Sequence, residues 1–251
     1  MASIINASTT STSGLVQTAD ASGVLQLQSN GVTGLTVGTG GVVTAANGMV
    51  FSSMTLGTAQ TGEFEYDGRV PYFTPAGAQR GVVPGMQYYR LNSDLVGTNA
   101  SGNQSVFGKS CTLASNTIYR YEYFISLVKS AGTTSHSIYL LFGGTCTNNN
   151  IFTSVQYSYN TVTPYVGSTN IAIGGYNSVT GLAGTAAMTA ASNQYVCQGF
   201  GSISVNAGGT FTPQYNLSAA PGGAYSTSAG SYFLIYPIGA AGADVNVGTW
   251  A

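Results

Sequence analysis

Apolar and polar residues alternate along much of the second half of the chain, and this alternation predicts β-strands. Between residues 119 and 127, tyrosine, isoleucine and leucine occupy the odd positions, whereas Arg120, Glu122 and Phe124 fall on even ones. A period of two residues is that of a strand with one face against a core. Residues 135–142 predict a matching strand after the turn at 130–133.

More segments after Met86 carry the same signal and are separated by glycine-rich turns. Strands spaced in this way favour a β-sandwich or jelly roll. Residues 180–192 are rich in alanine, but Gly181 and Gly184 favour a loop there over a helix. The predicted strands of this domain are Gln87–Leu91, Ser105–Phe107, Cys111–Leu113, Thr117–Val128, Ser135–Gly143, Asn150–Tyr159, Ile171–Ile173, Gln194–Val205, Thr210–Leu217 and Ser231–Ile238.

The stretch from Val196 to Ile238 carries no charge and is predicted to form an antiparallel meander. Residues 211–217 alternate as in a half-buried strand. Asn-Ala-Gly-Gly at 206–209 and Ala-Pro-Gly-Gly at 220–223 are turn sequences, because glycine accepts positive φ and proline fixes its own. The continuous apolar run at 232–236 predicts a strand that is covered on both faces.

Residues 2–48 are repetitive and predict a short β region. Apolar residues alternate in the pieces 23–28, 34–37 and 41–44, with Ser-Asn-Gly and Gly-Thr-Gly turn sequences between them. Strands this short cannot build a core alone, but several chains wound around one axis can bring their apolar residues together. The alternative is a disordered arm.

A hairpin and a linker are expected between this region and the larger domain. Val50–Leu56 is a candidate short strand, and Asp67-Gly68 predicts a hairpin turn. A carboxylate pair in the hairpin could act in acid–base chemistry or bind a cation. We favour a solvated face on which Arg69 pairs with an acid of the hairpin or of a neighbouring chain. The charged residues of the hairpin are Glu63, Glu65, Asp67 and Arg69.

These patterns predict an all-β protein with a short intertwined N-terminal β region followed by a C-terminal β-sandwich or jelly-roll head. The expected segments are residues 1–48 for the N-terminal shaft region, 49–85 for the connecting hairpin and linker, and 86–251 for the head. The domain boundary is expected between about Gly48 and Gly85.

Charge is scarce along the whole chain. Only 5% of residues are charged, against roughly 25% in ordinary soluble domains. A net charge of -1 gives little repulsion between copies, so much of the surface is expected to lie inside an oligomer or a larger particle.

The sequence also argues against several partners. Its 6 Lys and Arg residues form no basic stripe for nucleic acid. No window approaches the ~20 apolar residues of a membrane span, and no signal peptide is visible at the N-terminus. Cys111, Cys146 and Cys197 lack metal-ligand spacing, and we interpret them as small buried hydrophobes of a chain folded in a reducing cytoplasm.

Few side chains are available for catalysis. His136 is the only histidine. A nucleophile–histidine arrangement would also need an orienting carboxylate, from Asp67, Asp94 or Glu122. A structural or surface histidine is the better interpretation, and the chain is expected to be a non-enzyme without cofactor or metal.

Tyrosine and asparagine are the other side chains that could bind a ligand. The chain has 17 tyrosines and 1 tryptophan. In the uncharged half they suit a surface that stacks on sugar rings and hydrogen-bonds to hydroxyls. Packing between subunits is the alternative for any single residue. The candidate sugar contacts are Asn148, Asn149, Asn150, Tyr157, Tyr159, Tyr165 and Tyr176.

Three passages together resemble the small tail-fibre or virion structural proteins of tailed bacteriophages. They are Asp-Ala-Ser-Gly-Val-Leu-Gln-Leu-Gln-Ser-Asn-Gly at 20–31, Gly-Glu-Phe-Glu-Tyr-Asp-Gly at 62–68, and the block from 208 to 233. The resemblance implies a homotrimer with an N-terminal segment that docks on the virion, and it carries over no catalytic residues. The candidate virion-docking residues are Ile4, Ile5, Leu15 and Val16.

Two functions follow from this resemblance. One is a trimeric tail fibre whose head contacts the host surface, with glycan as the expected target. The other is a capsid decoration or cement protein, or a head fibre, that stabilises the shell. A depolymerase would need paired carboxylates, which the head lacks after Ser130 up to Ala243. The expected partners are sister copies and proteins of the tail, baseplate or capsid, and the expected location is the virion, assembled in the host bacterial cytoplasm.

Overall fold

The computed structural model is built from β-strands. It describes residues 24–29, 32–46, 48–160, 170–242, 244, 246–248 and 250. Every regular element in these ranges is a strand, which confirms the all-β class. None of these residues belongs to a helix that could cross a membrane. The chain divides into two compact units, Met1–Phe51 and Ser52–Ala251.

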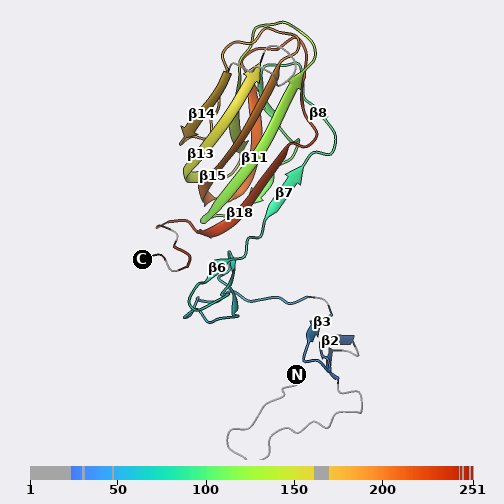
Figure 1. Ribbon diagram of the computed structural model, residues 1–251, viewed down its shortest axis with the longest axis vertical. Helices are drawn as coiled ribbons and strands as arrows, with labels where there is room; N and C mark the ends of the chain where they lie inside the picture. Colours follow the sequence, from blue (N-terminus) through green and yellow to red (C-terminus); the bar gives the residue numbers. More distant parts are fainter. Residues whose placement is uncertain are drawn as a thin grey trace, which may run out of the picture. The chain divides into compact units, whose positions relative to one another are not determined.

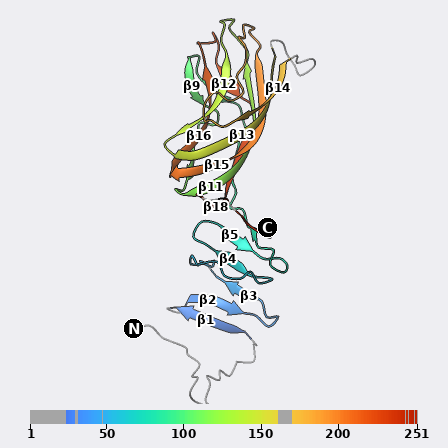
Figure 2. The ribbon, with the colours of Figure 1, turned by 90° about the vertical axis from the view of Figure 1, so that its left-hand side faces the viewer.

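The first unit contains a small antiparallel sheet in the order β1-β2-β3 (Figure 2). Its strands are β1 (Leu25–Ser29), β2 (Val32–Val37) and β3 (Val43–Ala45), which confirms that the repetitive region forms short strands. The β2–β3 turn is closed by the Gly38 N–H, which donates to the Val42 carbonyl at 2.9 Å. Winding with sister chains stays a prediction.

The second unit begins with another small sheet, in the order β4-β5-β6. Its strands are β4 (Phe64–Tyr66), β5 (Pro71–Phe73) and β6 (Gly81–Val82). The Asp67-Gly68 turn is confirmed, with Gly68 at φ 91°. The predicted strand at Val50–Leu56 is wrong, because these residues form no ladder, although the Met54 N–H donates to the Tyr66 carbonyl beside β4.

The rest of the second unit is the head, whose larger antiparallel sheet has eight strands (Figure 1). The central strand β11 pairs along its length with β15, and its other edge pairs with β18 and then β17. The strands are β7 (Gln87–Arg90), β8 (Leu95–Val96), β11 (Thr117–Lys129), β13 (Thr147–Asn160), β14 (Asn170–Tyr176), β15 (Gln194–Ala207), β17 (Tyr225–Thr227) and β18 (Tyr232–Ala240).

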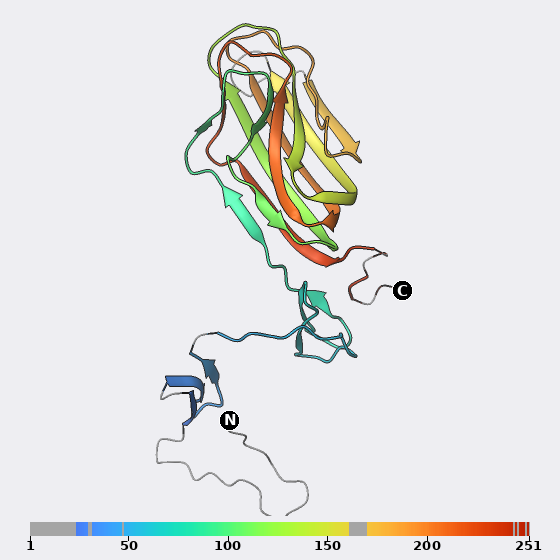
Figure 3. The same cartoon turned by 180° about the vertical axis from the view of Figure 1, so that it is seen from behind.

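A second antiparallel sheet of four strands forms the other layer of the head, visible from behind with β16 in orange (Figure 3). Strand β16 pairs with β12 on one side and with β9 and β10 on the other. This two-layer arrangement is consistent with a β-sandwich. The strands are β9 (Gly102–Ser105), β10 (Cys111–Leu113), β12 (Ile138–Gly144) and β16 (Gly209–Leu217).

Aromatic rings from both layers fill the core. The Tyr121 ring of β11 lies 5.4 Å from the Phe142 ring of β12 and 6.2 Å from the Phe211 ring of β16, measured between centroids. The odd-numbered residues of β11 face this core, as their alternation predicts. Residues 180–192 form a loop, as predicted, and this loop bonds to Leu140 of β12 and to His136 just before it through two isolated bridges.

The meander prediction for Val196–Ile238 is wrong. Strands β15 and β16 are joined by a short turn but lie in different sheets, and β18 pairs with β11 rather than with β16. Burial alternates along β18 instead of being continuous, so this strand is not covered on both faces. The short strands β6, β8 and β17 were not among the predicted ones, because two or three residues carry too little periodicity.

Candidate functional site

The large sheet has one face against the core and one face away from it, which we call the outer face. In an antiparallel sheet, directly paired residues point to the same side. Gln156 pairs with Gln198, Gln198 pairs with Phe124, and Phe124 pairs with Tyr232. Ile173 extends this row on β14, so one row of outward side chains crosses five strands.

A second outward row runs beside the first and carries a charge. Ser154 pairs with Phe200, Phe200 pairs with Glu122, and Glu122 pairs with Leu234. Successive outward residues on a strand lie two positions apart, so the rows are neighbours. Apolar rings, amides and a carboxylate therefore share the outer face.

Hydrogen bonds order the polar groups of the outer face. The Gln198 amide donates to Gln156 Oε1 at 3.0 Å, and the Tyr232 hydroxyl donates to Glu122 Oε1 at 3.1 Å. Burial, followed by the Glu122 carboxylate, raises the pKa of Tyr232 above its ordinary value. The phenol therefore stays protonated and holds one carboxylate oxygen in place.

Aromatic rings extend the same surface. The Tyr232 ring stacks on Tyr88 with centroids 5.7 Å apart and on Phe124 with centroids 6.4 Å apart. Phe200 is 55% exposed although it lies on a central strand. A depression of about 250 Å³ opens between these side chains. Its lining includes Glu122, Gln156, Ile173, Gln198, Phe200 and Tyr232.

The local sequence Gly199-Phe200-Gly201 explains why a large ring lies on the outer face at Phe200. Gly201 pairs with Tyr121 and Gly199 pairs with Tyr123, and both tyrosine rings lie in the core. A Cβ atom at Gly199 would come within 2.5 Å of the Tyr123 hydroxyl, and one at Gly201 within 2.1 Å of the Phe152 carbonyl. The glycines thus make room for inner rings, while Phe200 between them points outward.

The predicted asparagine contacts lie at the start of β13. Asn148 is half-buried, whereas Asn149 and Asn150 are exposed. The Asn149 side chain lies 3.4 Å from the Ser204 hydroxyl, at hydrogen-bond distance. These residues therefore present polar groups to solvent at one end of the sheet.

The predicted tyrosine contacts lie elsewhere. Tyr157, Tyr159 and Tyr176 are half-buried and border the core. The Tyr157 hydroxyl donates to the Gly184 carbonyl at 3.0 Å, and the Tyr159 hydroxyl accepts from the Ala186 N–H at 3.2 Å. These two tyrosines fasten the loop between β14 and β15.

The structure does not bring the two predicted groups together. Asn149 and Tyr157 are eight positions apart on β13, which corresponds to roughly 26 Å of strand. Tyr165 and the four candidate docking residues, Ile4, Ile5, Leu15 and Val16, lie outside the described residues.

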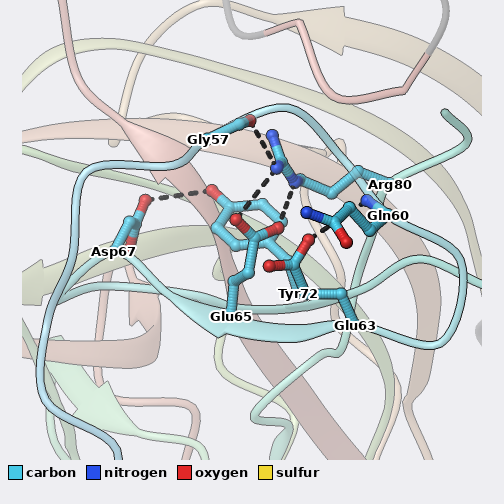
Figure 4. A network of polar contacts seen from close by, with 7 residues as sticks. All are labelled: Gly57, Gln60, Glu63, Glu65, Asp67, Tyr72 and Arg80. Atoms are coloured by element: carbon cyan, nitrogen blue, oxygen red, sulfur yellow. Dashed lines mark hydrogen bonds and ion pairs between the residues drawn. The ribbon is translucent and has the colours of Figure 1, made fainter. Parts of the chain in front are cut away.

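The charged hairpin has a different geometry from the one predicted (Figure 4). Glu65 is only 1% exposed, and its carboxylate pairs with the Arg80 guanidinium at 2.6 Å and 2.9 Å. Arg80 also donates to the Gly57 carbonyl at 2.8 Å. The prediction of a solvated face with Arg69 as the partner is therefore wrong at Glu65. The cation that pairs with Glu65 is Arg80, fifteen residues further along the chain.

Asp67 also has an internal role. One carboxylate oxygen accepts from the Arg69 and Val70 N–H groups at 2.7 Å, and the other accepts from the Tyr72 hydroxyl at 3.0 Å. Burial and this bond raise the pKa of Tyr72 to about 12. The carboxylates of Glu65 and Asp67 are thus used to hold the hairpin, which argues for a structural role of this cluster.

His136 belongs to a buried cluster at one end of the head. Its Nε2 lies 2.8 Å from the Tyr225 hydroxyl, and its Nδ1 lies 2.8 Å from the Thr134 carbonyl. The Lys129 ammonium lies 5.9 Å from the centre of the Tyr225 ring and donates to the Gly132 carbonyl at 2.9 Å. Burial lowers the pKa of both Lys129 and His136. These contacts describe a structural histidine, in agreement with the preferred interpretation.

The three cysteines are free thiols. Cys197 is buried in the core as predicted, but Cys111 and Cys146 are only half-buried at its border. Burial raises the pKa of Cys111 to about 11, so its thiol is protonated at neutral pH.

No protein-family model matches the chain, and a search of curated proteins gives no match. Functional assignment therefore depends on the geometry described above and on the sequence patterns. The outer face is the surface that the sequence interpretation missed. The signal was present at Phe124, a large aromatic residue on the charged side of a strand whose other side is apolar.

Proposed function

We propose that this chain is a structural protein of a bacteriophage virion, a trimeric tail fibre whose C-terminal head contacts the host cell surface. The two-part chain supports this, since a small-sheet region precedes a head with its own aromatic core. The resemblance of residues 20–31, 62–68 and 208–233 to such proteins provides the particle class. The proposal includes no catalytic step and no cofactor.

The observation that carries the proposal is the distribution of exposed apolar side chains. Of the twenty large hydrophobic residues that are exposed in the described chain, fifteen lie between Leu25 and Tyr89. Val32 is 62% exposed, Val42 67% and Val50 99%. So many exposed apolar side chains within one stretch of the chain suit burial against other copies. Because the chain carries so little charge, electrostatic repulsion between its copies is weak and does not oppose their association.

The sheet of β4, β5 and β6 shows the same property in the clearest form. Phe64 and Phe73 pair across the strands, on the side where they are 41% and 42% exposed. Glu65 and Tyr72 pair on the other side and are buried. Polar groups inside and phenylalanine outside suit a sheet whose exposed side packs on sister chains.

The first test measures the mass of the full chain by light scattering. Three copies are expected, and a folded monomer at micromolar concentration would contradict the proposal. A second test labels the intact phage particle with antibodies and gold. Label at the tail supports the fibre, whereas label over the whole capsid supports the alternative, a decoration protein or head fibre that stabilises the shell.

A further inference from the structure

We infer that the depression on the outer face of the large sheet binds one ring of a neutral surface glycan. This inference rests on the proposed contact between the head and the host surface, and it names the residues and the ligand class. It replaces the asparagine and tyrosine groups of β13 as the preferred glycan contact, because those two groups lie far apart.

The chemistry of the lining fits a sugar ring. A pyranose presents carbon-bound hydrogens on its faces and hydroxyl groups around its rim, so its site needs an apolar plate and surrounding hydrogen-bonding groups. Phe200 and Tyr232 provide rings at the depression, and Ile173 adds an apolar side chain that is 75% exposed. Gln156, Gln198 and Glu122 provide the hydrogen-bonding groups.

The polar groups are held in place before any ligand arrives. The bond between Gln198 and Gln156 uses one donor of the first amide and one acceptor of the second. An amide side chain has two donors and an acceptor with two lone pairs, so both keep further bonding capacity. The Tyr232 hydroxyl likewise fixes the Glu122 carboxylate, which has a second oxygen for a sugar hydroxyl. Such preorganisation lowers the entropic cost of binding.

The charge of the lining favours a neutral ligand. Glu122 is the one acidic side chain of the lining, which includes no basic side chain. An anionic sugar would place its carboxylate near that of Glu122, which costs free energy when both are ionised. A neutral hexose meets no such repulsion.

A second copy of the chain fits this depression less well. A protein surface packed flat on the outer face would remove water from Glu122 and from both amides. Buried polar groups without partners cost about 1–3 kcal/mol each, and a carboxylate costs more. The exposed apolar side chains of residues 25–83 carry no such penalty and remain the expected self-interface.

The experiment uses the full chain and saturation-transfer NMR with methyl glycosides of glucose, galactose, N-acetylglucosamine and rhamnose. At least one of these is expected to receive saturation from the protein. Phe200→Ala is expected to weaken that sugar's binding about tenfold, the loss of one stacking ring. The matched control is Phe152→Ala, because Phe152 is also 55% exposed and outward but does not line the depression.

Two further comparisons sharpen the test. Gln198→Ala removes a hydrogen-bonding group without changing a ring, and it is expected to weaken sugar binding. This variant tests the site independently if Phe200→Ala folds poorly. The methyl glycoside of glucuronic acid is expected to bind more weakly than that of glucose, because it adds a carboxylate near Glu122.

The inference is overturned if none of the four neutral glycosides receives saturation, or if Phe152→Ala and Phe200→Ala weaken binding equally. It is also overturned if Phe200→Ala lowers the mass of the assembly, since the outer face is then an interface between copies. A wild-type chain that is trimeric and labels the tail but binds no sugar would leave the proposed fibre standing, so the two failures can be told apart.

Discussion

The head and the sheet of β4, β5 and β6 use the same alternation in opposite ways. In β11 the aromatic Tyr121 is fully buried and the neighbouring Glu122 is exposed. In β4 the neighbouring residues are reversed, with Glu65 buried and Phe64 41% exposed. Alternation divides a strand into two faces, but the surroundings decide which face is inside. In the head the second sheet covers the aromatic face; in the small sheet we propose that sister chains cover it.

The largest expected effect comes from the head core. Tyr121→Ala removes a ring that contacts the Phe142, Phe211 and Phe233 rings. It is expected to lower the free energy of unfolding of the head by about 3–5 kcal/mol, through lost burial and a cavity. Chemical denaturation measures this. The control is Arg120→Ala on the outer face, expected within about 0.5 kcal/mol of wild type, and an equal loss in both variants would contradict the assignment of faces.

The second largest effect is a loss of stability in the small sheet that distinguishes Arg80 from Arg69. Arg80→Leu leaves the buried Glu65 carboxylate without its cation and is expected to destabilise the small sheet by about 3 kcal/mol. Faster hydrogen exchange at the Thr74 N–H, which bonds to the Glu63 carbonyl, would report this loss. Arg69→Leu is the matched control, because its side chain is exposed and its N–H to Asp67 is kept. Equal exchange in both variants would restore Arg69 as a candidate partner.

A smaller effect is expected at the exposed side of the small sheet. Phe64→Ser removes apolar area that the assembly is proposed to bury; because Phe64 is 41% exposed before assembly, this area is worth about 0.6–1.2 kcal/mol for each chain. Dissociation of the assembly is therefore expected at a higher protein concentration, measured by light scattering over a dilution series. Val96→Ser, which changes a 68% exposed head residue, is the control. An unchanged dissociation curve for Phe64→Ser would show that this side packs on nothing.

The smallest effect is a pH dependence confined to the head, because the chain has 1 histidine. Burial, reinforced by the Lys129 charge, lowers the pKa of His136 below its ordinary value in the folded state. As pH falls below about 6.5, the unfolded chain takes up a proton that the folded chain does not, so stability falls by at most about 1.4 kcal/mol per pH unit. Melting between pH 7 and pH 5 should show this slope. His136→Gln should flatten it, and an unchanged slope would mean that another group titrates.

Much of the head could be predicted from the sequence because burial imposes a period of two on each strand. Cys111–Leu113 is found with the predicted bounds, and β11 differs from its prediction by one residue. The candidate binding residues were harder to predict. A tyrosine such as Tyr157 looks the same in sequence whether its hydroxyl meets a sugar or the Gly184 carbonyl. Phe200 could have been suspected from the glycines on both sides, which leave it as the only side chain there.

The sequence alone determined the longer strands of the head, since alternation and turn glycines are local properties that need no knowledge of distant residues. It determined neither the sheet that each strand joins nor the face that is buried. Strands β15 and β16 follow each other in the chain yet lie in different layers, and Glu65 takes its cation from Arg80 rather than from Arg69. These outcomes depend on contacts between residues far apart in the chain, where packing and desolvation of the whole fold outweigh local preference.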